Sequence, residues 1–246
     1  MGRISDLEEI SKARLKFNGV VTVKSAPESE LMVQGIGANT AVTLSTSDLS
    51  KHLIKYAANL RLEDSVFFHE FCHVKLNEIG FKKAEALIED AVAKCCSSES
   101  EIIQMQIARV LVAETLADSI LYRFFRKESE DLRGQLDYSF CMTHSLRTIE
   151  RKYGLQGITQ AAAYRVAKEH SGFGDQVSLG GAIREAFGRG EVAKSYDAIF
   201  AALSELPSIG SGDSDDTVRD LNDGEVRAIV DCALRLFEIK TGKKCE

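Results

Sequence analysis

The chain has 246 residues, of which 44% are hydrophobic and 28% charged, as in an ordinary globular protein with a substantial core. Its formal net charge of -6 argues against nucleic acid or an anionic membrane surface as a partner. No apolar run approaches the ~20 residues that span a bilayer. The charged segment 1–17 lacks the apolar stretch of a secretion signal, and six cysteines are too few for a disulfide scaffold. We therefore expect a soluble protein of the reducing cytoplasm.

The first third of the chain is predicted to form a small sheet. Three segments rich in β-branched and apolar residues are predicted strands, at 19–24, 31–34 and 41–44. We expect them to pair mostly antiparallel. The serines between 45 and 47 are typical of a helix N-cap and predict a short helix over 48–54.

From Glu63 onward the pattern predicts helices almost throughout. They are expected at 63–79, 81–96, 100–126, 135–153, 157–170, 178–187, 192–205 and 217–241. Glycines stand where four of these helices are expected to end: Gly80, Gly154, Gly172 and Gly188. The predicted fold class is therefore α+β, mainly helical, with the small sheet at the N-terminal side.

The most informative motif is His69-Glu70-Phe71-Cys72-His73, inside the first long predicted helix. His69 and His73 are four residues apart, so both imidazoles lie on one helix face and can bind one metal ion. Zinc suits this pair because it accepts neutral imidazole and tolerates an open coordination position. Glu70 projects about 100° around the helix from His69, where it can act as general base on a zinc-activated water. The alternative is a pair of hydrogen-bonded core histidines without a metal.

A zinc site needs a third protein ligand. The residues that follow the motif exclude the three-histidine continuations, because Leu76, Asn77 and Ile79 occupy the positions that would have to be glycine or histidine. The remaining histidines are distant in sequence: His52, His144 and His170. A carboxylate is therefore the better candidate.

The helix predicted over 100–126 carries Glu114 and Asp118 on one otherwise apolar face. Carboxylates in such a place need an explanation, because charged groups are rarely buried without partners. A metal provides one: Glu114 would bind zinc, and Asp118 would accept a hydrogen bond from a ligand histidine and fix its tautomer. Alternatively, both pair with arginines such as Arg109 or Arg123, or face a solvent cleft.

His69-Glu70-x-x-His73 followed by Glu114-x-x-x-Asp118 resembles the gluzincin group of zincin metallopeptidases. The resemblance covers about residues 19–126 and implies that His69, His73 and Glu114 bind zinc. By the same resemblance, Glu70 would be the general base, and Asp118 would accept a hydrogen bond from a ligand histidine. It also implies that the strand at 41–44 lines the cleft and pairs with an extended substrate.

The resemblance further implies a zincin-like domain, which we place at 1–170. A helical extension at 171–246 is expected to pack on the same domain. One departure is that about 40 residues separate His73 from Glu114, more than in thermolysin-like members. The helix predicted at 81–96 would fill this interval.

Peptide hydrolysis develops negative charge on the carbonyl oxygen, and gluzincins typically offer it a tyrosine or histidine donor. His144 is the preferred candidate, and it could instead be the third zinc ligand. Tyr122 and Tyr138 are alternatives, while Arg147 could hold a substrate carboxylate.

The sequence thus predicts a zinc metallopeptidase acting on peptide or protein substrates. An alternative from another class is a non-catalytic zinc-binding regulatory or interaction protein that retains the site. A third is a helical module in which the motif has no metal role. No nucleic-acid or membrane partner is expected, and the residues specify neither the substrate nor the oligomeric state.

Overall fold

The computed structural model describes residues 3–33, 37–38, 40–58, 62–173, 179–209 and 218–245. Its elements run in the order α1 (Arg3–Leu15), β1 (Val20–Ala26), the 3-10 turn η1 (Glu28–Glu30), β2 (Met32–Val33), β3 (Gly37–Ala38), β4 (Ala41–Ser45), β5 (Lys51–Ala57), α2 (Asp64–Leu76), the π-helical turn η2 (Asn77–Phe81), α3 (Lys82–Cys95), α4 (Glu99–Phe124), α5 (Glu130–Cys141), α6 (Thr143–Tyr153), α7 (Leu155–His170), α8 (Leu179–Phe187), α9 (Glu191–Leu203) and α10 (Asp223–Thr241). Helices dominate, and the α+β class predicted from the sequence fits this arrangement. None of the described helices is both long and apolar enough to cross a membrane.

The main sheet has three strands in the order β1-β5-β4. β1 pairs in parallel with β5 from Val20 opposite Lys51 to Ala26 opposite Ala57, whereas β4 pairs antiparallel with β5. β2 and β3 form a separate antiparallel pair. The main sheet is therefore mixed rather than mostly antiparallel. A parallel pair needs a crossover connection, which the segment 27–50 supplies.

The helix predicted over 48–54 is wrong, because Lys51–Ala57 form β5, the central strand. Asp48 accepts hydrogen bonds from Thr46 Oγ1 at 2.6 Å and from Ser50 Oγ at 2.9 Å. These polar residues close the turn between β4 and β5 instead of capping a helix. α1 was not predicted from the sequence. The helix packs on α2, but it buries only two large apolar side chains, Leu7 and Leu15, so its apolar pattern is weak.

The helices predicted from residue 63 onward are present in the predicted order. The helix predicted over 135–153 is two helices, α5 and α6, because the backbone of Met142 between them is extended. Residues 178 and 217, the predicted first residues of two helices, lie outside the described residues. All four glycines predicted to end helices have positive φ angles, at Gly80, Gly154, Gly172 and Gly188.

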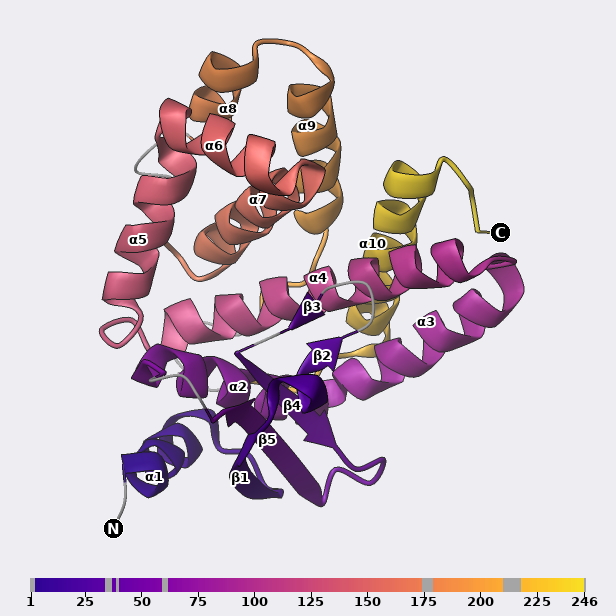
Figure 1. Cartoon of the computed structure of the whole chain (residues 1–246). Helices are drawn as coiled ribbons and strands as arrows, with labels where there is room; N and C mark the ends of the chain where they lie inside the picture. The colour runs from indigo at the N-terminus through magenta and orange to yellow at the C-terminus, as the bar shows by residue number, and fades with distance from the viewer. Residues whose placement is uncertain are drawn as a thin grey trace.

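α4 is the centre of the arrangement. It is 26 residues long and contacts α2, α7 and α10. Figure 1 shows α5 to α9 gathered on one side of α4, with α1, α2 and the sheet on the other. One hydrophobic cluster includes Phe71 of α2, Ile120 of α4, Ile158 of α7 and Leu236 of α10. Because α2 and α4 share this core, their facing residues are held in a fixed relation.

Gly80 lies where α2 and η2 turn into α3, with a φ of 121°. An alanine there would adopt a left-handed conformation, so we expect Gly80→Ala to lower the free energy of unfolding by roughly 1–2 kcal/mol. Gly134, inside α5 with no atom within 4 Å of an added Cβ, is the matched control. Gly134→Ala should raise stability by roughly 0.5–1 kcal/mol. Urea unfolding measures both, and a shift of the same sign in the two variants would contradict this account.

Candidate metal centre

α2 is held in place by a largely apolar surface. The side chains that anchor it are Phe67, Phe68, Phe71, Cys72, Val74 and Leu76, all buried. His69 and His73 lie on its remaining face, with side chains 17% and 15% exposed. Packing of the apolar side chains therefore directs both imidazoles toward α4.

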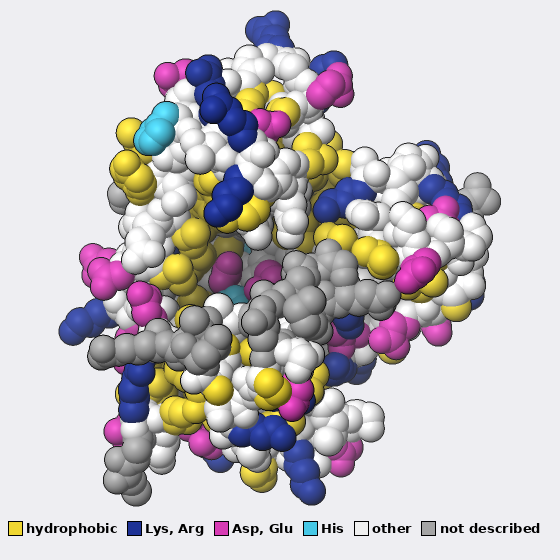
Figure 2. Space-filling model, in the orientation of Figure 1, with side chains coloured by type: hydrophobic (Ala, Val, Ile, Leu, Met, Phe, Trp, Pro, Cys, Tyr) yellow, Lys and Arg dark blue, Asp and Glu magenta, His cyan; other side chains and the backbone are white. Residues whose placement is uncertain are grey.

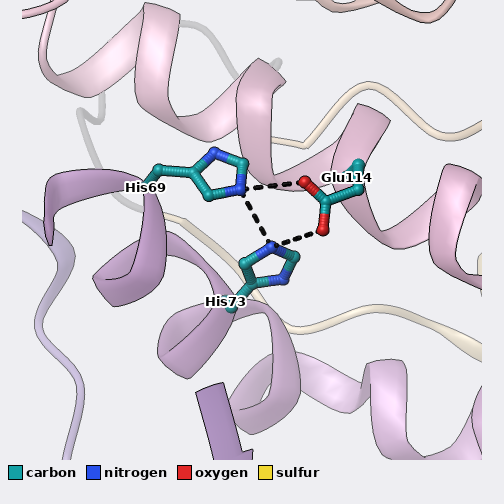
Figure 3. A group of neighbouring side chains, drawn as sticks. All are labelled: His69, His73 and Glu114. Carbon is teal, nitrogen blue, oxygen red and sulfur yellow. Dashed lines mark hydrogen bonds and ion pairs between the residues drawn. The ribbon is translucent and has the colours of Figure 1, made fainter. Parts of the chain in front are cut away.

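Both histidines meet Glu114 of α4 (Figure 3). His69 Nε2 lies 3.1 Å from Glu114 Oε2 and 3.1 Å from His73 Nε2. His73 Nε2 lies 3.3 Å from Glu114 Oε1. Among the described residues, this is the one group of three or more histidine, cysteine or acidic side chains whose ligand atoms converge closely enough for a metal ion. The structure thus brings together the three residues that the sequence suggested as ligands.

Asp118 lies one helical turn beyond Glu114, and its Oδ1 is 2.9 Å from His69 Nδ1. An Nδ1–H that donates to this carboxylate leaves Nε2 of His69 with its lone pair directed at the other two side chains. The pairing with arginines is not found among the described residues, since Arg109 pairs with Glu85 at 2.7 Å and Arg123 lies over the ring of Phe124. Both carboxylates, Glu114 and Asp118, do face a cleft, as the other alternative predicted, with side chains 46% and 25% exposed.

The contact between His69 and Glu114 shifts the pKa of both groups. Removal from water lowers the pKa of His69, but the carboxylates of Glu114 and Asp118 outweigh this and raise it well above its usual value. Desolvation raises the pKa of Glu114, but His73 and His69 outweigh this and hold it far below its usual value. Glu114 is therefore ionised at neutral pH, and a metal must compete with a proton for His69.

Glu70 lies beside the three donors without joining them. The residue is 6% exposed, and its Oε2 accepts a hydrogen bond from Thr43 Oγ1 at 2.6 Å. Thr43 belongs to β4, the strand at the edge of the sheet. The resemblance to gluzincins implied that residues 41–44 line the cleft, but it did not single out Thr43. Only the pairing of β4 with β5 fixes which side chain reaches α2.

These side chains open into a cavity of about 800 Å³. Its walls come from β4, α2, η2, α3, α4, α5, α7 and α10, and its lining includes Glu70, Asp118 and the three donors. In Figure 2 the hollow has acidic and histidine side chains at its bottom. A cavity of this size accommodates several residues of a peptide or a molecule of comparable bulk.

The residues predicted to stabilise an oxyanion do not line this cavity. His144 is exposed on α6, which the break at Met142 separates from α5. Tyr138 is 62% exposed and Tyr122 is fully buried. Arg147, which was predicted to hold a substrate carboxylate, also lies outside the cavity lining and donates to the carbonyl oxygen of Ala186. His144 is thus placed neither as third ligand nor as oxyanion donor.

Tyr164 of α7 is a cavity residue that the sequence did not suggest. Its hydroxyl lies 2.9 Å from Asp137 Oδ1 and 3.0 Å from the carbonyl of Arg133. Burial, and then the hydrogen bond to Asp137, raise the pKa of Tyr164 far above its usual value. It lies 50 residues beyond Glu114 in sequence, so only the packing of α7 on α4 could reveal it.

Comparison with known proteins leaves the site to be interpreted from its own geometry. No family model, curated protein or solved structure matches the chain. The resemblance to gluzincins therefore stays a prediction that rests on His69, Glu70, His73, Glu114 and Asp118.

Asp118→Asn tests the role of the carboxylate behind His69. We expect zinc affinity to fall 10- to 100-fold, the usual effect of removing a carboxylate that orients a ligand histidine. Competition with a chromophoric chelator measures the change. His144→Ala, a histidine outside the cavity, should bind zinc as the wild type does. Equal affinity of Asp118→Asn and wild type would contradict the assignment.

Proposed function

We propose that the protein is a gluzincin-like zinc peptidase that hydrolyses peptide bonds. The observation that carries this proposal is the convergence of His69, His73 and Glu114 next to the buried carboxylate of Glu70. Two imidazoles and one carboxylate form a donor set found in catalytic zinc sites, and they leave a coordination position open.

The spacing of the donors supports zinc. Tetrahedral ligand atoms bound at about 2.0–2.1 Å from zinc lie about 3.3 Å from one another. Here the two Nε2 atoms lie 3.1 Å apart, and each is 3.1–3.3 Å from a different oxygen of Glu114. One ligand atom from each of the three residues lies within 4.8 Å of the other two, so a small adjustment would bring them to this spacing. Hydrogen bonds account for the contacts of both histidines with the carboxylates, but they do not explain why Nε2 of His69 and Nε2 of His73 face each other at 3.1 Å. A metal ion would give the two nitrogens one shared partner.

Zinc held there would polarise a scissile carbonyl and lower the pKa of a water molecule. The carboxylate of Glu70 would take a proton from the attacking water and pass it to the leaving amine. Thr43 holds Oε2 of Glu70 by its hydroxyl, which leaves Oε1 to accept that proton. Asp118 would keep His69 in the tautomer that binds the metal.

A peptide substrate is supported by the position of β4. Among the described residues it is an edge strand, paired on one side with β5, and it lines the cavity from Ala41 to Ser45. An extended peptide could add to this edge and so lie across the three donors.

One observation favours the non-catalytic alternative. Each of the side chains suggested from the sequence as oxyanion donors lies outside the cavity, and the Tyr164 hydroxyl is engaged by Asp137. A zinc site in a regulatory or interaction protein would need no such donor. The two functions are distinguished by whether the zinc-loaded protein hydrolyses any unfolded protein.

Glu70→Gln is the direct test of catalysis. The amide cannot accept a proton from water, so we expect hydrolysis of fluorescently labelled casein to fall 10²- to 10⁴-fold. Zinc affinity should stay near the wild-type value because Glu70 is not among the three donors. Wild-type protein that holds one zinc and cleaves nothing would favour the non-catalytic alternative, and full activity of Glu70→Gln would exclude this role for the residue.

Thr43→Val keeps the shape of the side chain but removes the hydrogen bond to Glu70. A hydrogen bond to a charged group contributes roughly 1.5–3 kcal/mol, so we expect kcat to fall about tenfold or more with little change in KM. Thr43→Ser retains a hydroxyl and should recover most of the rate. If Val and Ser variants have the same kcat, the hydroxyl does not position Glu70.

A further inference from the structure

The cavity extends from the metal centre along α4 toward a cationic end. Its α4 lining runs from Asp118 and Glu114 back to Arg109 and Ile107. Arg109 precedes Glu114 by five residues, which corresponds to about 7.5 Å of helix rise. The same distance is about two residues of an extended peptide.

Three charged residues of the lining form a cluster at this end. Arg109 Nη1 lies 2.7 Å from Glu85 Oε1, and Lys82 Nζ lies 2.5 Å from Glu85 Oε2. Two cations therefore share one carboxylate, and the cluster has one positive charge in excess. The metal end of the cavity, by contrast, carries the acidic groups Glu70, Glu114 and Asp118.

Lys240 of α10 adds a second excess positive charge to the cavity lining. The ion pair of Lys243 with Glu101 at 3.0 Å brings the end of α10 beside the N-terminal part of α4. Lys240 is partly buried, and no hydrogen bond or ion pair involves it within the part of the chain that the structure describes. Burial lowers the pKa of Lys240, as expected for an ammonium that has lost water without gaining an acidic partner.

We propose that Lys240 forms a subsite, at the end of the cavity that Arg109 also lines, which binds a carboxylate of the peptide substrate. The proposal rests on the proposed function and deepens it. A carboxylate seated there would form the charge-assisted hydrogen bonds that Lys240 lacks, which offsets the cost of its burial. The carboxylate is either the free C-terminus of a peptide or an aspartate or glutamate side chain.

Two synthetic libraries of randomised decapeptides test the subsite, one with free C-termini and one with C-terminal amides. Mass spectrometry of the products locates the cleaved bonds for the zinc-loaded wild type and three variants. Lys240→Met keeps the apolar stem without the charge, and Lys240→Arg keeps the charge. Lys244→Met removes one positive charge from a neighbouring residue that does not line the cavity. Thermal unfolding of each variant verifies that it is folded.

We expect the wild type to cleave bonds near a carboxylate about tenfold more efficiently than other bonds, which is the effect of a charge-assisted hydrogen bond. If the preference is confined to the free-acid library, the subsite binds the C-terminal carboxylate. If aspartate and glutamate are also enriched near the cleaved bonds of the amide library, the subsite binds an acidic side chain. Lys240→Met should lose the preference while still cleaving other bonds, whereas Lys240→Arg and Lys244→Met should retain it.

Cleavage without carboxylate preference in the wild type, or an unchanged preference in Lys240→Met, would overturn the subsite and leave the proposed peptidase intact. Cleavage of neither library by the zinc-loaded wild type would overturn both.

Discussion

Four ionisable side chains face one another between α2 and α4, in a contact that is otherwise apolar. Their side chains are between 15% and 46% exposed, so each has lost part of its contact with water and gains a partner of opposite charge or a hydrogen bond in return. Here His69 contacts both Glu114 and Asp118, and His73 contacts Glu114. The apolar residues of both helices hold the three donors in a fixed relation. Donors held in this way lose less conformational entropy when a ligand binds.

The remaining parts of the site are placed around this contact. β4 lies against α2, so the hydroxyl of Thr43 reaches the general base predicted at Glu70. α7 packs on α4 and contributes to the wall across the cavity from the sheet, while α10 brings Lys240 to its lining. The cavity therefore has an acidic end at the donors and a cationic end along α4. A substrate with a carboxylate would be oriented by this polarity as well as by the edge of the sheet.

The sequence predicted the parts of this account that depend on local spacing. A four-residue interval on a helix is enough to place His69 with His73, and Glu114 with Asp118, and the glycines with positive φ angles were recognisable as helix ends. What the sequence could not supply depends on tertiary pairing. β5 was mistaken for a helix because its strand conformation comes from pairing with β1 and β4 on its two sides.

Side chains contributed by remote segments were also missed. Thr43 and Lys240 acquire their positions only when β4 and α10 pack against the helices around the cavity, and neither belongs to a motif. His144 was the preferred oxyanion donor because gluzincins typically use a tyrosine or histidine, but the structure places it on the surface of α6. The extended backbone at Met142 ends α5 without a glycine or proline to signal it.

Anomalous diffraction at the zinc absorption edge, from crystals of the protein loaded with zinc, tests the central claim most directly. The account predicts one peak, bound by Nε2 of His69, Nε2 of His73 and the carboxylate of Glu114, at about 2.0–2.2 Å from each, with a coordination position open toward Glu70. No peak between α2 and α4, or a zinc closed off by a fourth protein ligand, would contradict it.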